Sequence, residues 1–157
     1  MTGWELRAAD PTDVDALLEF WLVAGEPTDR HDTREAVARL VAHDPDAVIL
    51  AVDGTELVGS VVAGWDGWRC HLYRLAVHPE HRRQGIATAL LAAAEERFVA
   101  VGGRRADAMV LDDNTLGAGA WRAAGYTPQE QWSRWVKPLP AADPGPPRPT
   151  VRALGAP

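Results

Sequence analysis

The first part of the chain changes from strand-like to helix-like spacing of its apolar residues. Residues 4–8 alternate apolar and polar side chains, which predicts a short half-buried strand. Asp10, followed by a proline, suits the N-cap of a helix. Apolar residues then recur at helical spacing, at Val14, Leu17, Leu18, Trp21 and Leu22. A polar loop is expected over 26–32, and Thr33 is expected to cap a second helix that ends near Asp44.

The middle of the chain predicts three antiparallel strands and then a long helix. The apolar run 48–52 precedes an Asp-Gly pair, a strong hairpin-turn signal, and 57–63 is its expected partner strand. A third strand is expected over 71–77. The helix is expected from Gln84 to Val101, where a Gly-Gly pair ends the apolar stripe.

The last part of the chain predicts shorter elements and a tail. A strand is expected over 108–111, a helix over 114–124 and a final pair of strands over 126–139. The resulting order, β-α-α-β-β-β-α-β-α-β-β, predicts a mixed α/β (α+β) fold. Its central sheet would be mostly antiparallel and flanked by helices, with one βαβ crossover. Residues 1–139 are expected to form a single domain, and residues 140–157, which hold six prolines, an extended tail.

Composition excludes several classes of protein. The 157 residues carry 16 basic and 22 acidic side chains, a net charge of −6, which disfavours a partner made of nucleic acid. No apolar run is long enough to cross a membrane, and the first residues lack a signal-peptide core, so a cytoplasmic protein without a membrane partner is expected. Cys70 is the single cysteine, so no disulfide can form within the chain, and it is expected to be a packed thiol. No metal site is expected, since His31 and His43 lack the spacing of metal ligands.

The segment that follows the third predicted strand carries the clearest chemical signal. Arg82 and Arg83 precede Gly85 at the start of the long helix. The first N–H groups of a helix have no partner within it and attract anions, and a glycine lets the backbone approach a phosphate closely. The pattern therefore predicts a diphosphate site. The alternative is an arginine-rich surface loop before an ordinary helix. The glycine motifs of P-loop ATPases and of dinucleotide-binding dehydrogenases are both absent from the sequence.

This segment, Arg82-x-x-Gly85-x-Ala87 after a strand, resembles the pyrophosphate-binding motif of the GNAT superfamily of acyl-CoA-dependent N-acetyltransferases. Asn114 with Trp121, followed by a Gly-Tyr pair, resembles the second signature of that superfamily. The turn at 64–69 is similar to that of a bacterial subgroup. The resemblance covers nearly the whole chain except the tail, and it implies a GNAT-like sheet with acetyl-CoA as cosubstrate.

The resemblance also implies roles for individual residues. Backbone groups of the third predicted strand would bind the pantetheine arm, the loop and first helical turn would hold the diphosphate, and a hydroxyl and an amide side chain would add hydrogen bonds. The implied cofactor-binding residues are Leu75, Ala76, Val77, Arg82, Arg83, Gln84, Gly85, Ile86, Ala87, Thr88 and Asn114. Trp121 would lie near the thioester sulfur, where the superfamily usually has the tyrosine that acts as general acid.

The third predicted strand also holds the candidate general base. Alternation would place His71, Tyr73, Leu75 and Val77 on one face, and histidine is the residue type most often used as a general base at neutral pH. The alternative is a histidine bonded to backbone or solvent at a strand end. Three weaker candidates for the base are Asp66, Glu80 and Asp112.

Trp121 is a poor general acid, because an indole N–H does not give up its proton usefully. Tyr73 and Tyr126 are possible substitutes for it, and of the two Tyr126 is expected to pack in an apolar slot. Trp65 and Trp68 flank a turn and would either pack or line an amine pocket.

The leading functional hypothesis is an N-acetyltransferase that moves an acetyl group from acetyl-CoA to a primary amine by direct attack on the thioester. The acceptor would be a small amine or the amine of a peptide. A second hypothesis is a non-catalytic acyl-CoA-binding sensor or interaction module, which the tryptophan at 121 favours. A third is an interaction domain whose proline-rich tail binds a neighbouring chain. A homodimer through the terminal strands or the tail is compatible with the sequence.

Overall fold

The computed structural model describes residues 3–26 and 32–140. The chain divides into two units, with the boundary between Thr127 and Pro128. The single domain predicted over 1–139 stays a prediction, and the predicted tail lies outside the described residues except for its first residue. Among the described residues, no helix is long and apolar enough to cross a membrane.

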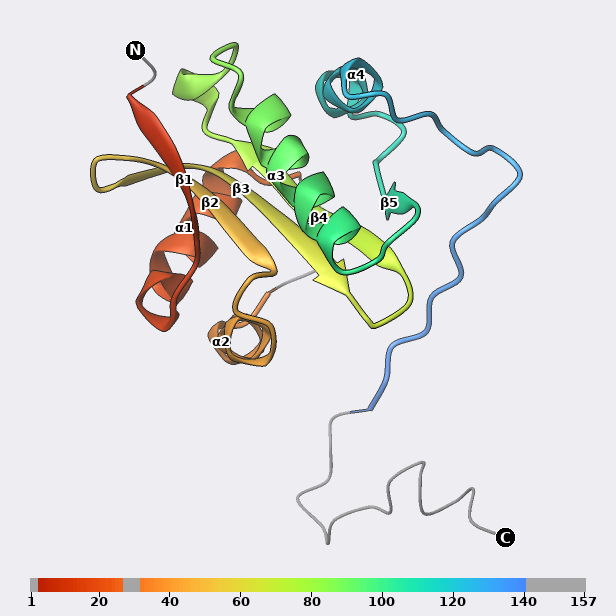
Figure 1. Ribbon diagram of the computed structural model, residues 1–157, viewed down its shortest axis with the longest axis horizontal. Helices are drawn as coiled ribbons and strands as arrows, with labels where there is room; N and C mark the ends of the chain where they lie inside the picture. The colour runs from red at the N-terminus through yellow and green to blue at the C-terminus, as the bar shows by residue number, and fades with distance from the viewer. Residues whose placement is uncertain (1–2, 27–31, 141–157) are drawn as a thin grey trace, which may run out of the picture. The chain divides into compact units, whose positions relative to one another are not determined.

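The first unit is a five-stranded sheet with helices on both faces (Figure 1). The strands are β1 (Trp4–Ala8), β2 (Val48–Asp53), β3 (Glu56–Trp65), β4 (Cys70–Val77) and β5 (Ala106–Ala108). The helices are α1 (Val14–Ala24), α2 (Arg34–His43), α3 (Ile86–Ala100) and α4 (Thr115–Ala123), with short 3-10 turns η1 (Pro11–Asp13) and η2 (Pro79–His81). Strands β1 to β4 form an antiparallel meander, and β5 pairs parallel to β4 after the crossover through α3. The predicted mixed α/β fold is confirmed.

Local capping explains where the first two helices begin. The Asp10 side chain accepts a hydrogen bond from the Thr12 N–H at 2.7 Å, and Asp13 accepts one from the Asp10 N–H at 2.8 Å, so a capping box opens the first helical segment. Thr33 accepts a hydrogen bond from the Ala36 N–H at the start of α2. The predicted helix starts are therefore confirmed.

Two apolar clusters fill the space between the sheet and its helices. Helices α1 and α2 pack against one face, and α3 packs against the other. In α1 the buried residues are Val14, Leu17, Phe20 and Trp21. Leu22, which the helical spacing assigns to the apolar stripe, is exposed, and Phe20 is buried instead. Gly59 of β3 allows α3 to approach closely, since a Cβ atom there would lie 2.6 Å from Ile86 Cγ2.

A β-bulge in β4 changes which side chains share a face of the sheet. The pairing with β3 shifts by one residue between Tyr73 and Ala76, and Arg74 has a left-handed φ of 51°. Leu75 and Val77 consequently pack in the cluster on the α3 face, as Leu72 does. The prediction that His71, Tyr73, Leu75 and Val77 share one face is wrong, because the extra residue reverses the alternation after Tyr73.

The end of the chain differs from the sequence-based expectation. Strand β5 covers Ala106–Ala108 rather than 108–111, and described residues 126–140 contain no strand, so the predicted final strand pair is wrong. Proline at 128, 138 and 140 removes backbone donors from any such ladder. The apolar side chains that suggested strands do not form a buried face: Trp135 is 91% exposed.

Candidate functional site

The turn between β4 and α3 has the backbone form of an anion-binding site. Arg83 and Gly85 both adopt left-handed φ angles, of 63° and 80°, and the side chains from Arg82 to Gly85 are exposed. Hydrogen bonding within α3 begins only with the Ala89 N–H, which donates to the Gly85 carbonyl at 3.0 Å. The earlier amides are therefore available to an anion, and the two arginines add positive charge beside them. Buried Ile86 anchors this helix end to the sheet.

Beside this turn, β4 has a backbone edge that no strand covers among the described residues. β4 and β5 pair only from Cys70 with Ala106 to Leu72 with Ala108. The segment from Arg74 to Val77 continues beyond the last pair, and no residue of it belongs to the β4–β5 ladder. The implied pantetheine contacts of Leu75, Ala76 and Val77 fall on this segment.

Buried polar contacts hold the bulge in place. The Ser60 hydroxyl donates to the Arg74 carbonyl at 2.8 Å and accepts from the Trp21 indole N–H at 2.9 Å. The Arg74 guanidinium pairs with Asp32 and lies 5.1 Å from the centroid of the Trp21 ring. Ser60 is fully buried. If its hydroxyl were removed, the Trp21 N–H and the Arg74 carbonyl would each lose a hydrogen bond that water cannot replace there. These contacts couple α1 to the strand that holds the candidate base.

His71 lies between two aspartates. Its Nδ1 is 2.8 Å from an Asp107 carboxylate oxygen, and its Nε2 is 3.7 Å from an Asp66 carboxylate oxygen. The imidazole side chain is 32% exposed, and its ring centroid lies 6.2 Å from that of Tyr73. A carboxylate at Nδ1 keeps the proton on that nitrogen and leaves the Nε2 lone pair to accept another. The sequence also allowed a histidine bonded only to backbone or solvent. The contact with the Asp107 side chain does not fit that alternative.

Asp66, one of the weaker base candidates from the sequence, stabilises the turn between β3 and β4 instead. One of its oxygens accepts hydrogen bonds from the backbone N–H groups of Arg69 and Trp68, at 2.6 and 2.8 Å. These N–H groups lower the pKa of the Asp66 carboxyl, so it stays charged beside the imidazole. Sequence reasoning missed Asp107, whose contact with His71 depends on the parallel pairing of β4 with β5.

Asn114 caps α4 and contacts Glu26, two residues after the end of α1. Its Oδ1 accepts from the Gly117 N–H at 2.9 Å, and its Nδ2 donates to a Glu26 carboxylate oxygen at 3.1 Å. The same oxygen accepts from the Leu111 N–H at 2.8 Å. Glu26 thus ties the loop before α4 to the residues that follow α1. No local pattern in the sequence distinguishes it from the other residues of a polar loop.

Trp121 and Tyr126 pack against each other in the cluster on the α3 face. Their ring centroids are 5.0 Å apart at an interplanar angle of 76°. The Tyr126 hydroxyl donates to a Glu95 carboxylate oxygen at 2.8 Å. Burial, together with this carboxylate, raises the pKa of the Tyr126 hydroxyl, which makes it a poor proton donor. The expected packing role of Tyr126 is therefore confirmed.

A cavity of about 360 Å³ opens beside Asp107, between the turn that joins β3 to β4 and the C-terminal end of α3; His71 does not line it. Its lining includes Trp65 and Trp68 and four charged residues, Arg69, Arg104, Arg105 and Asp107.

Cys70 is buried, and burial raises the pKa of its thiol, so the expected packed thiol is confirmed.

A bulged strand that separates from its parallel neighbour beside an exposed, arginine-flanked helix start is an arrangement that suits an acyltransferase whose acyl carrier bears phosphate. The family model of the acetyltransferase (GNAT) family matches residues 13–126, and the chain belongs to this family. It is an acetyltransferase that takes its acetyl group from acetyl-CoA. An acetyltransferase of Pectobacterium atrosepticum is 34% identical over 122 residues, which cover 78% of this chain and 86% of that protein.

Solved structures share the fold at lower sequence identity. Ard1 from Thermoplasma volcanium matches with a TM-score of 0.71 and 16% identity over 80% of this chain and 84% of that one. AAC(6')-Iy, solved with the bisubstrate analogue CoA-S-monomethyl-acetylneamine, matches with a TM-score of 0.69 and 18% identity over 87% of this chain and 99% of that one. The roles of individual residues in this chain remain predictions.

Proposed function

We propose that the protein transfers the acetyl group of acetyl-CoA to a primary amine by direct attack on the thioester. The single observation that carries this proposal is the contact of His71 on β4 with Asp107 on β5, one residue before the last pair of the two strands. An oriented imidazole beside an open strand edge supplies a base next to a place for an acyl group.

The cosubstrate would lie along β4 and across the start of α3. The uncovered backbone of Leu75, Ala76 and Val77 would bind the pantetheine amides, with Asn114 Nδ2 as a further donor once it leaves Glu26. The diphosphate would be held by the segment from Arg82 to Ala87, that is Arg82, Arg83, Gln84, Gly85, Ile86 and Ala87, with the exposed hydroxyl of Thr88 beside it.

In the proposed reaction His71 Nε2 accepts a proton from the ammonium group of the acceptor, and the neutral amine that results attacks the thioester. A lysine-like amine has a pKa of about 10.4, so its deprotonation at pH 7 costs about 4–5 kcal/mol, whereas an α-amine costs about 1 kcal/mol. The amine nitrogen forms a bond to the acetyl carbon, the carbon–sulfur bond breaks, and CoA leaves as thiolate. Tyr73, on the same face as His71, would donate its hydroxyl proton to the sulfur and recover a proton from the nitrogen, which loses its second proton as the amide forms. Trp121 would pack near the sulfur without donating a proton to it.

The cavity that Asp107 lines would hold the acceptor. Its three arginines against one aspartate favour an amine that also carries an anionic group, in spite of the negative net charge of the chain. Trp65 and Trp68 would cover its apolar part. This lining differs in character from what a polycationic aminoglycoside such as the acetylneamine part of the AAC(6')-Iy ligand needs.

The alternative function is an acyl-CoA-binding module without catalysis, and the packing of Trp121 on Tyr126 favours it. Two measurements separate the hypotheses. Acetyl-CoA is titrated into the purified protein, and thiol release is then followed with a panel of amines that includes amino acids, dipeptides and uncharged alkylamines. Binding with thiol release supports the enzyme, and faster release with anionic amines supports the acceptor class.

Binding without release from any amine on the panel would favour the sensor. Failure to bind acetyl-CoA would contradict the assignment of the α3 start as the diphosphate site. Arg104→Ala tests the acceptor pocket: it should raise the KM of anionic amines and leave that of uncharged alkylamines unchanged.

A further inference from the structure

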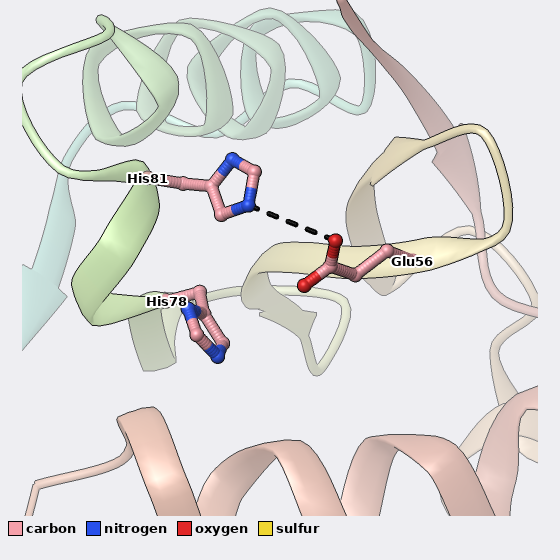
Figure 2. Close-up of side chains that lie close together, drawn as sticks. All are labelled: Glu56, His78 and His81. Atoms are coloured by element: carbon pink, nitrogen blue, oxygen red, sulfur yellow. Dashed lines mark ion pairs between the residues drawn. The ribbon is translucent and has the colours of Figure 1, made fainter.

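Two histidines and a glutamate meet at the turn that leads from β4 to the diphosphate loop. Glu56 is the first residue of β3, and His78 and His81 lie at the start and the end of η2. Each offers one ligand atom, and these atoms all lie within 4.8 Å of one another. Figure 2 shows the His81 ring directed at the Glu56 carboxylate, with His78 beside it on the same turn.

The separation of the ligand atoms suits a shared cation better than direct contact. His81 Nε2 lies 3.8 Å from a Glu56 carboxylate oxygen, which is too long for a hydrogen bond. Zinc holds imidazole nitrogen and carboxylate oxygen at about 2.0–2.2 Å, so two ligands of one tetrahedral ion lie roughly 3–4 Å apart. The Glu56 side chain is 57% exposed and free to rotate toward the third ligand. The imidazoles meet edge to face with centroids 5.7 Å apart.

Neither histidine is committed to a strong hydrogen bond. His81 Nδ1 is buried and has no hydrogen-bond partner among the described residues. His78 Nδ1 accepts from the Glu80 N–H at 3.3 Å, beyond the usual length of such a bond. The orphaned Nδ1 lies on the other side of the His81 ring from the Nε2 that faces Glu56, so Nε2 is the nitrogen that would bind an ion.

We propose that Glu56, His78 and His81 bind a transition-metal ion of the zinc class. Two imidazoles and one carboxylate are borderline ligands that Zn²⁺ accepts, and water would take the fourth position. The bound ion would tie the start of β3 to the turn before α3, outside the proposed acetyl-transfer site. The sequence-based expectation of no metal site considered other histidines, and it overlooked these because Glu56 is distant from them along the chain.

The test uses the full chain without a polyhistidine tag, treated with a chelator and dialysed. Zn²⁺ is titrated calorimetrically, and thermal unfolding is measured with and without Zn²⁺. We expect one ion per chain and a rise in Tm, because a ligand that binds only the folded state stabilises it. Glu56→Gln and His78→Gln should each weaken Zn²⁺ binding by about tenfold or more and remove the rise in Tm.

Matched controls come from the same turn and from another helix end. Glu80→Gln changes a carboxylate between the two histidines, and His43→Gln changes an exposed histidine outside the cluster. Both variants should bind Zn²⁺ with the affinity of the unmodified chain. The absence of saturable binding, or Zn²⁺ binding that both ligand variants retain, would overturn the proposal. Acetyl-CoA binding of the metal-free protein, measured in parallel, separates this failure from a failure of the proposed acetyl-transfer site.

Discussion

Replacing His71 with glutamine tests the proposed base directly. General-base catalysis contributes about 10²–10⁴-fold, which corresponds to roughly 3–5 kcal/mol in the activation free energy. The loss in kcat/KM should be larger for a lysine-like amine than for an α-amine, because the first needs about 4–5 kcal/mol for deprotonation at pH 7 and the second about 1 kcal/mol. Thiol release with one amine of each kind gives the two ratios.

Asp107→Asn should lower kcat/KM by less than His71→Gln, and the size of the decrease can be calculated from the geometry. The carboxylate lies 2.8 Å from Nδ1, and at the dielectric constant of water a charge pair at this separation is worth about 1.5 kcal/mol. The high value of the dielectric constant is appropriate because the Asp107 side chain is 57% exposed. Loss of that stabilisation of the imidazolium predicts a decrease of about tenfold in kcat/KM.

The affinity for acetyl-CoA is the control measurement for both substitutions. It should be unchanged in His71→Gln and Asp107→Asn, since neither side chain belongs to the proposed cosubstrate site. His43→Gln, at the end of α2, controls for the loss of a histidine elsewhere. If His71→Gln kept the full kcat/KM for both amines while it still bound acetyl-CoA, the assignment of His71 as the base would be refuted.

Three further substitutions test the supporting structure. Ser60→Ala leaves the buried Trp21 N–H without its acceptor, at a cost of about 2 kcal/mol, so Tm should fall by about 4–8 °C in a thermal melt; an unchanged Tm would contradict the role of this hydrogen bond. Gly85→Ala forces a side chain into a left-handed φ of 80° and should weaken acetyl-CoA binding in a calorimetric titration, and unchanged affinity would count against the diphosphate site. Tyr126→Phe removes only the hydrogen bond to Glu95 and should keep full thiol release, whereas a large loss of activity would restore Tyr126 as the general acid.

Sequence reasoning succeeded where the signal is local. Asp10 and Thr33 cap helices through atoms a few residues away, and the turn after β2 contains a glycine with a positive φ of 62°. The loop before α3 also carries its own signal, since charge, glycine and helix start are adjacent in the chain. Such features depend on short-range chemistry, and a single sequence contains all of it.

The parts that could not be predicted depend on contacts between distant segments. The bulge at Arg74 depends on Ser60 and Trp21, which come from another strand and from a helix. The pair of His71 and Asp107 joins residues 36 apart, and it forms only because β5 aligns in parallel with β4. Periodicity alone continues the alternation through a bulge, and it therefore places the later side chains of β4 on the wrong face.

That reversal bears on the mechanism. His71 lies on the opposite face of β4 from Leu75 and Val77, which face α3 and the proposed diphosphate site. CoA would then approach along the α3 face and the amine from the cavity that Asp107 lines, with the acetyl carbon at the opening between β4 and β5. Transfer through an acyl-cysteine would need Cys70, but that thiol is 1% exposed, faces the α3 cluster and has a raised pKa. The arrangement therefore favours a ternary complex of enzyme, acetyl-CoA and amine over a covalent acetyl-enzyme.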